Sequence, residues 1–233
     1  MADGDTFDVS DIPETPVSGR RLGRHVEHDA RSRNFPAAVA PIADVKHVRH
    51  GEPFDQGDLG SCTGNAMAGA LMTEPFYTAT RVLTETNAVS LYEQATHLDK
   101  VTGSYPPDDT GSTGLAVAKA AKKDGYISAY SHAFSFQQAL GALTLAPVIA
   151  GINWYTSFDT PLPTGECPLT TGATIRGGHE IELFGIDVEK QQIWVYQSWG
   201  PTWGGLGNGT FWFSYTTFEQ LLAEKGDVTA FTA

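Results

Sequence analysis

Residues 56–66 read QGDLGSCTGNA, and this stretch decides how the rest of the chain is interpreted. Gln56 precedes Cys62 by six residues, and Cys62 opens a segment that we expect to be helical. A thiol attacks carbonyl groups as the thiolate, which a helix N-terminus favours through its dipole and free N–H groups. The Gln56 amide and the Cys62 backbone N–H would supply the two donors of an oxyanion hole. The competing interpretation is a buried, inert cysteine on an alanine-rich helix, the commoner fate of a single cysteine.

The composition fits a packed globular protein with an acidic surface. A chain of 233 residues, 41% of them hydrophobic, is long enough for one large domain or for two lobes around a cleft. The net charge of −12 argues against a nucleic-acid partner, which would need a basic face. The sequence has no apolar run of membrane-spanning length and no hydrophobic secretory core, so we expect no membrane partner, no signal peptide and a cytoplasmic location.

The cysteine and histidine content limits the chemistry further. If Cys62 stays free, Cys167 has no partner within the chain, which indicates a reducing compartment. We expect Cys167 to be an incidental thiol in a loop. The spaced histidines at 25 and 28 and at 47 and 50 lack further ligands in a recognisable pattern, so we expect neither a metal site nor a cofactor.

The N-terminal region divides into an acidic and a basic part. Residues 1–20 form an Asp-, Glu-, Pro- and Ser-rich tail that we expect to be mobile, ahead of a single domain over residues 21–233. The basic side chains that follow are expected to lie on a solvated surface; they are Arg20, Arg21, Arg24, Arg31 and Arg33.

Hydrophobic spacing predicts helices in the first part of the chain and strands in the second. The expected helices begin at Cys62 and stop before Pro75, run over 113–124, cover 136–143, and cover 218–222. The expected strands cover 147–152, 179–188, 193–199 and 210–215. This order predicts an α+β protein whose two halves meet at a groove.

His179 stands apart from the other histidines because Gly178 precedes it and an apolar strand follows. A thiol nucleophile needs a base, and the base needs a partner that orients its ring. In an antiparallel hairpin the strand beginning at His179 would lie beside the strand ending near Gln197, whose amide oxygen would accept from the imidazole. Trp199 would then exclude water from that bond. The alternatives are a strand-end histidine satisfied by the backbone and a tryptophan that belongs to the core.

These three segments together resemble the papain family of cysteine peptidases. The motifs are Gln56 with GSC at 60–62, GH at 178–179 followed by Ile181 and Gly185, and SWG at 198–200 with WG at 203–204. They resemble the family's oxyanion glutamine and nucleophile, its histidine strand and its asparagine loop, in the family order. Residues 59–66 resemble especially the bacterial and bacteriophage branch, and the resemblance covers about residues 24–228.

The resemblance implies a two-lobed papain-like α+β fold with the active site in the cleft. The helical lobe would span about residues 56–145 and the antiparallel β lobe about 146–233, with the N-terminal segment packing across both. It also implies a thiol endopeptidase acting on a protein or peptide substrate through an acyl-enzyme intermediate. Cys62 and His179 would form a thiolate–imidazolium pair, and Gln56 would hold the oxyanion. Gly111, Gly178 and Trp199 would bind the extended substrate.

Two positions depart from the family pattern. Thr63 stands where the family has an aromatic residue, and Gln197 stands at the orienting asparagine. Glutamine keeps the amide but adds about 1.5 Å of reach and one torsion, so we expect impaired or retuned activity.

Other functions stay open on the same residues. One alternative is an amidase that cleaves cell-wall crosslinks or isopeptide bonds, and another is a catalytically silent binding or structural protein. About fifty residues precede Gln56, which is too few for a full inhibitory domain. We therefore expect restraint by narrow specificity, by a regulatory partner, or by sequestration in a virion if a phage encodes the chain.

Overall fold

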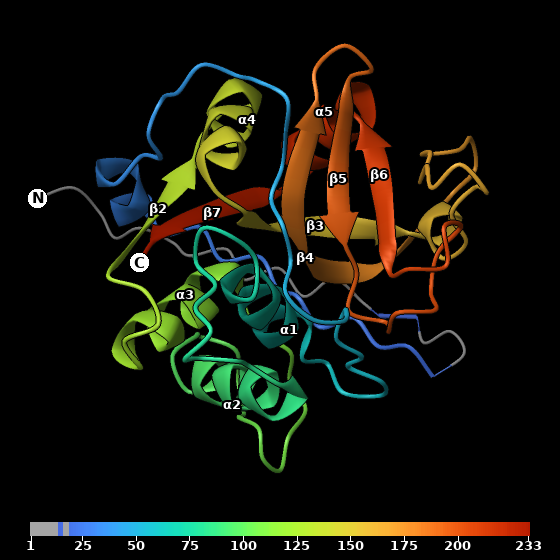
Figure 1. Ribbon diagram of the computed structural model, residues 1–233. Coiled ribbons are helices and arrows are strands. Elements are labelled where there is room, and N and C mark those ends of the chain that lie inside the picture. Colours follow the sequence, from blue (N-terminus) through green and yellow to red (C-terminus); the bar gives the residue numbers. More distant parts are fainter. Residues whose placement is uncertain (1–13, 16–18) are drawn as a thin grey trace, which may run out of the picture.

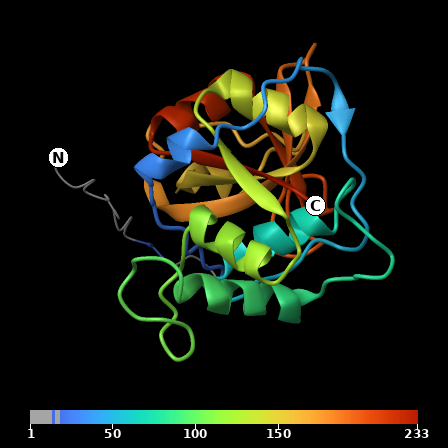
Figure 2. The ribbon, with the colours of Figure 1, turned by 90° about the vertical axis from the view of Figure 1, so that its left-hand side faces the viewer.

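The computed structural model describes residues 14–15 and 19–233, and within them helices and an antiparallel sheet form two layers (Figures 1 and 2). The helical layer contains α1 (Cys62–Leu71), α2 (Glu85–Thr96) and α3 (Gly114–Lys123). The sheet has the order β2-β7-β3-β4-β5-β6, with β1 (Val45–Lys46) paired to β4 off this path. The predicted α+β class is confirmed. The tail predicted over residues 1–20 falls largely outside the described residues.

The central strands of the sheet follow the predicted segments. They are β3 (Val148–Tyr155), β4 (Ile175–Asp187), β5 (Gln192–Tyr196) and β6 (Thr210–Ser214). The expected hairpin forms, with Glu182 opposite Tyr196. His179 lies opposite Ile152 of β3, so the strand pair at the centre of the sheet fixes its position.

Three strands and one helix were not predicted from the sequence. The strands are β1, β2 (Ala129–Ala133) and β7 (Asp227–Thr232), and the last two pair with each other along one edge. The helix is α2, which begins with a capping box between Thr84 and Asn87. Its buried positions at 88, 91, 92 and 95 have helical spacing. That signal is present in the sequence but is diluted by the polar residues between them.

Helix α1 begins at Cys62 and ends before Pro75 as expected, and all ten of its residues are buried. It lies between α2 and α3 on one side and β4 on the other. Gly64 allows the close approach to α2, because a Cβ there would lie 2.1 Å from the Ala88 carbonyl oxygen. A helix packed on all sides needs small residues, and the sequence CTGNAMAGAL supplies them.

The apolar core consists of two clusters, one within the helical layer and one on the sheet. Helix α4 (Phe136–Leu145) contributes Ala139, Leu140 and Leu143 to the sheet cluster, together with Phe218 of α5 (Tyr215–Ala223). The helical lobe was expected to extend to residue 145 and so to include α4. In the structure α4 packs against β4 of the sheet. Apolar spacing predicts that a helix buries a stripe, and it does not say which layer that stripe meets. No helix within the described ranges is both long enough and apolar enough to cross a membrane.

Candidate active site

Cys62 is the first residue of α1 and is fully buried. The backbone amide of Glu180, which follows His179 in β4, favours the thiolate and so lowers the pKa of Cys62. This contact places the sulfur beside the His179–Glu180 peptide. Burial outweighs it and raises the pKa of the thiol well above its ordinary value. The predicted helix N-terminus is therefore present, but burial opposes the thiolate that it would favour.

His179 is held by the residue predicted to orient it. Its Nε2 lies 2.6 Å from Oε1 of Gln197, and the same oxygen accepts the backbone N–H of Ser198 at 2.8 Å. Because an amide oxygen only accepts, the neutral ring carries its hydrogen on Nε2. Nδ1 is then the basic nitrogen, and it is buried with no hydrogen-bond partner in the described part of the chain.

Trp199 covers the His179–Gln197 pair, as the sequence indicated. Its ring lies 5.3 Å from the imidazole centroid, and Trp154 of β3 meets the imidazole edge-on at 5.0 Å. This aromatic enclosure excludes water, which strengthens the bond to Gln197 but opposes a charge on the ring. Burial accordingly lowers the pKa of His179 to about 3.

Gln56 joins the nucleophile loop to the loop that carries Gln197. Its Oε1 accepts the Ser198 hydroxyl at 2.6 Å, which turns Nε2 toward the cleft. There Nε2 donates to the Leu59 carbonyl at 2.9 Å, to that of Arg21 at 3.1 Å and to that of Leu22 at 3.3 Å. The predicted oxyanion donor is thus directed at carbonyl oxygens of the chain's own N-terminal region.

Residues 19–26, here called the covering segment, fill the cleft. Gly23 and Arg24 both donate their backbone N–H to the Gly178 carbonyl, at 3.1 and 3.0 Å. Ser112 donates to the Gly23 carbonyl at 2.8 Å and accepts from His25 at 2.7 Å. The segment therefore forms a parallel bridge at Ser112 and lies against the edge of β4.

The glycines predicted to bind substrate are in contact with this segment. A Cβ at Gly178 would lie 2.1 Å from the Arg24 carbonyl oxygen, and one at Gly111 would lie 2.3 Å from that of Gly23. Gly111 also has a φ of +73°, which other residues rarely adopt. The backbone that pairs with the segment belongs to Ser112 rather than to Gly111.

Two observations bear on the expected state of this site. Residues 19–26 are held along the cleft by backbone hydrogen bonds to Gly178 and Ser112, an intramolecular contact that the expected restraint by specificity, a partner or sequestration did not include. Burial raises the pKa of the Cys62 thiol and lowers that of the His179 ring, and so opposes the predicted thiolate–imidazolium pair in the covered cleft.

Two expectations away from the cleft are tested by the structure. Cys167 lies in the irregular stretch between β3 and β4, as expected of a loop thiol, but it is buried in the sheet cluster, where its thiol lies 3.8 Å from the Phe158 carbonyl. Arg24 is 2% exposed, so the basic patch is not a uniformly solvated surface. Within residues 14–15 and 19–233, no three or more His, Cys, Asp or Glu side chains group as metal ligands.

Asp109 is a supporting residue whose role the sequence analysis did not assign. It accepts the Gly60 backbone N–H at 3.0 Å and the Tyr92 hydroxyl at 2.6 Å, and it pairs with Arg21 of the covering segment. It therefore holds the loop ahead of Cys62 and fastens the segment across it. The adjacent aspartates at 108 and 109 carry no sequence signal for contacts this distant.

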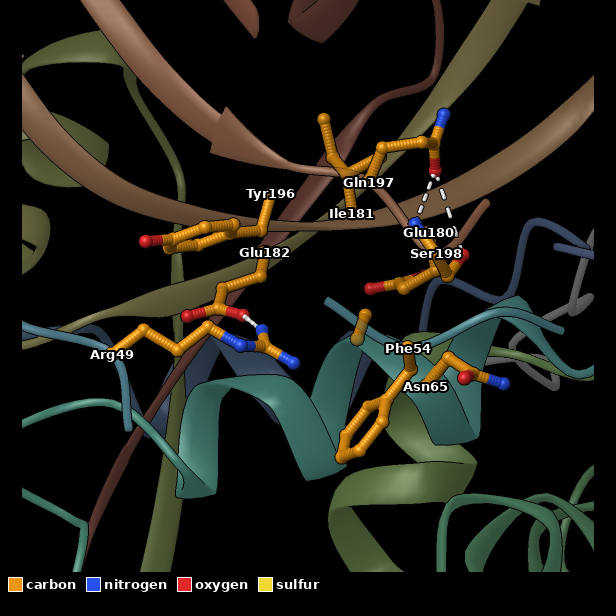
Figure 3. Close-up of a pocket in the computed structure, with 10 residues that line it drawn as sticks. Arg49, Phe54, Asn65, Glu180, Ile181, Glu182, Tyr196, Gln197 and Ser198 are labelled. Carbon is orange, nitrogen blue, oxygen red and sulfur yellow. Dashed lines mark hydrogen bonds and ion pairs between the residues drawn. The ribbon is translucent and has the colours of Figure 1, made fainter. Parts of the chain in front are cut away.

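A small cavity of about 10 Å³ lies behind Gln197, between α1 and the β4–β5 hairpin (Figure 3). This is room for about one water molecule. Arg49 and Glu182 form a buried ion pair on its wall, and Thr73 of the neighbouring turn donates to the same carboxylate. These contacts tie the helical layer to β4 next to the His179–Gln197 pair.

Comparison with solved structures identifies the architecture. Xylellain, a cysteine protease from Xylella fastidiosa, matches with a TM-score of 0.72 over 94% of this chain and 99% of its own, at 18% identity. The fold is that of the papain-like cysteine proteases. Papain-like neighbours also include digestive procathepsin L 3 of Tenebrio molitor (TM-score 0.64, 14% identity, 92% of this chain and 76% of that one). Another is bromelain from Ananas comosus in complex with the E64 inhibitor, with a TM-score of 0.52 and 15% identity over 78% of this chain and 93% of its own. No family model and no curated protein sequence matches the chain.

Proposed function

We propose that this protein is a thiol-dependent endopeptidase with Cys62 as nucleophile and His179 as its base. The observation that carries the proposal is the 2.6 Å bond from His179 Nε2 to Gln197, which leaves Nδ1 as the free basic nitrogen, while the Cys62 thiol lies by the backbone amide of the next residue, Glu180. The pairing of Nε2 with an amide oxygen fixes the tautomer in which Nδ1 can take up a proton. The papain-like fold supports the same assignment.

The reaction follows from these positions. The Cys62 proton passes to His179 Nδ1, and the sulfur attacks the carbonyl carbon of a peptide bond. The oxygen takes up negative charge and is held by Gln56 Nε2 and the Cys62 backbone N–H. The C–N bond breaks as His179 returns its proton to the leaving amine, which leaves a thioester. Water then gives a proton to His179 and attacks the thioester carbonyl; the C–S bond breaks and His179 returns the proton to the sulfur, which releases the acid and restores the thiol.

In this proposal the described chain is a latent form. Gln56 Nε2 donates to the carbonyls of Arg21 and Leu22, so the oxyanion donor already holds the covering segment. Water can reach Cys62 and His179 only after the segment leaves. Rehydration then removes the burial that raises the pKa of the thiol and lowers that of the ring.

Gln197 engages His179 at an ordinary hydrogen-bond distance, which favours the enzyme over the catalytically silent protein. Neither the cell-wall nor the isopeptide substrate has an observation of its own in its favour.

The test is labelling by a thiol-directed epoxide at neutral pH, together with hydrolysis of fluorogenic peptides. Both are measured on the full chain and on the same chain with Arg21→Ala, which removes the ion pair that fastens the covering segment to Asp109. We expect labelling that is faster in Arg21→Ala than in the wild type, that Cys62→Ala abolishes, and that Cys167→Ala, the matched removal of the other buried thiol, retains. In Arg21→Ala, labelling of Cys62 no faster than that of a small free thiol, with no peptide hydrolysed, would contradict the proposal.

A further inference from the structure

The side chain of Arg24 lies in a pocket beside the catalytic pair. Its Nη2 forms an ion pair with Asp227 at the start of β7 and donates to the Lys225 carbonyl at 2.9 Å. The side chain has no exposed surface. Burying a guanidinium is costly unless an acidic site is built to receive it. The pocket around Arg24 is therefore a binding site for a cationic side chain.

Two glycines make room for this side chain. A Cβ at Gly151 of β3 would lie 2.4 Å from Arg24 Nε and 2.7 Å from Asp227 Oδ1. A Cβ at Gly114, the first residue of α3, would lie 2.7 Å from Glu180 Oε1 and 3.1 Å from Asp227 Oδ2. Strand and helix thus both lack a side chain at the point where a long basic group enters.

Glu180 supplies a second carboxyl group to the pocket. It is 1% exposed, and neither of its oxygens has a hydrogen-bond partner among residues 14–15 and 19–233. Burial and Asp227 raise its pKa, and Arg24 opposes that rise. A buried carboxyl without a hydrogen bond is destabilising, so a structural role does not account for it.

The residues of this pocket are neighbours in sequence of the residues at the candidate active site. Glu180 directly follows His179, and Arg24 is two residues beyond Leu22, whose carbonyl faces Gln56. Asp227 also borders a cavity of about 530 Å³ lined by Leu115 and His132, which provides space at the carboxylate end.

We propose that Glu180 and Asp227 form a specificity pocket for an arginine or lysine side chain of the substrate, and that Arg24 occupies this pocket in the covered chain. This inference rests on the proposed peptidase function and names its substrate class: peptides with a basic residue one or two positions from the cleaved bond. Arg24 is then a built-in occupant that a basic substrate replaces. Within the described residues, Arg24 Nε and Nη1 have no hydrogen-bond partner, and neither have the two carboxyl oxygens of Glu180. A substrate arginine placed slightly differently in the pocket would donate to Glu180 as well as to Asp227.

The test measures kcat/KM of the full chain on fluorogenic peptides that carry Arg, Lys, Gln or Leu at each of the two positions before the leaving group. We expect Arg and Lys to exceed Leu by about 10- to 150-fold at one position, as charge-assisted hydrogen bonds imply. Glu180→Gln and Asp227→Asn should each reduce the Arg-to-Leu ratio. Glu93→Gln, which removes an exposed carboxylate on α2, is the matched control and should leave the ratio as it is.

A second measurement uses the built-in occupant. Arg24→Leu should speed epoxide labelling of Cys62 in the full chain, and should do so less in the Asp227→Asn background, where the ion pair is already lost. If a pocket variant does not fold, Gly151→Ala narrows the pocket from the opposite wall and should also lower the Arg-to-Leu ratio.

The outcomes separate the two proposals. Hydrolysis with no basic preference, or with a ratio unchanged in every folded pocket variant, refutes the pocket and leaves the peptidase standing. If Cys62 is not activated and no peptide is cleaved, the peptidase is refuted and the pocket assignment falls with it.

Discussion

Shortening Gln197 to asparagine should slow the enzyme, although asparagine is the residue that the papain-family resemblance leads one to expect at this position. In the structure Gln197 Oε1 already lies 2.6 Å from His179 Nε2. Removing one methylene retracts the amide by about 1.5 Å and leaves roughly 4 Å between the two atoms, beyond hydrogen-bond reach. The backbone of this loop is fixed by the Gln197 N–H to the Gly209 carbonyl at 2.9 Å, so it does not follow the shorter side chain.

The size of the effect follows from what is left unpaired. A buried donor that loses its acceptor costs about 1–3 kcal/mol, which corresponds to about 5- to 150-fold in kcat/KM if the loss falls on the transition state. Because Gln197 positions the ring and does not touch substrate, we expect the loss in kcat, with KM nearly unchanged. The covering segment is the same in the wild type and in Gln197→Asn. The equilibrium between covered and open cleft therefore cancels when the kcat of one is divided by the kcat of the other.

The assay is steady-state hydrolysis of one fluorogenic peptide by the wild type, Gln197→Asn, Gln197→Leu and Gln220→Asn. Gln197→Leu keeps most of the bulk and removes the acceptor, so it should be at least as slow as Gln197→Asn. Gln220→Asn makes the same change at an exposed position on α5 and should match the wild type. An unchanged or raised kcat in a folded Gln197→Asn variant would refute the positioning role.

Two further results are expected from stability measurements. Thr113→Ala should lower the free energy of unfolding by about 1 kcal/mol, because the Thr113 hydroxyl caps α3 by accepting the Ala116 N–H. Thr113→Ser keeps this cap and is the control. An equal loss of stability in both variants, measured by urea titration, would contradict the capping role. As the pH falls from 6.5 toward 3, the wild type should lose stability relative to His179→Asn, because its pKa of about 3 in the folded state means that only the unfolded chain takes up the proton. Parallel pH profiles of the two proteins would show that His179 is not buried as described.

The sequence predicted the parts of the site that are local. The start of α1 at Cys62 and the extent of α3, capped by Thr113 and closed at Gly125 with a φ of +72°, follow from residues a few positions apart. The hairpin that brings Gln197 to His179 follows from two apolar strands and a short polar turn. Neighbouring residues decide these features, so a single sequence shows them.

What the sequence did not show depends on distant partners. Arg24 and Asp227 are 203 positions apart, and nothing near Arg24 distinguishes it from a solvated arginine. The covering segment has no helical or strand period, because it is held by hydrogen bonds to the edges of two other segments. The raised pKa of Cys62 likewise depends on which residues exclude water, a property of the assembled cleft.

The intrinsic fluorescence of Trp199 can report on the position of the covering segment. In the covered chain its Nε1 donates to the Arg21 carbonyl at 3.3 Å, and the guanidinium carbons of Arg20 and Arg176 each lie 5.6 Å from its ring. Departure of the covering segment strips away two of these neighbours and wets the ring, while Trp154 and Trp203 keep their places in the core. Unlabelled protein should therefore shift its emission to longer wavelength as the cleft opens, and the opening rate becomes measurable by stopped flow before any peptide is cut.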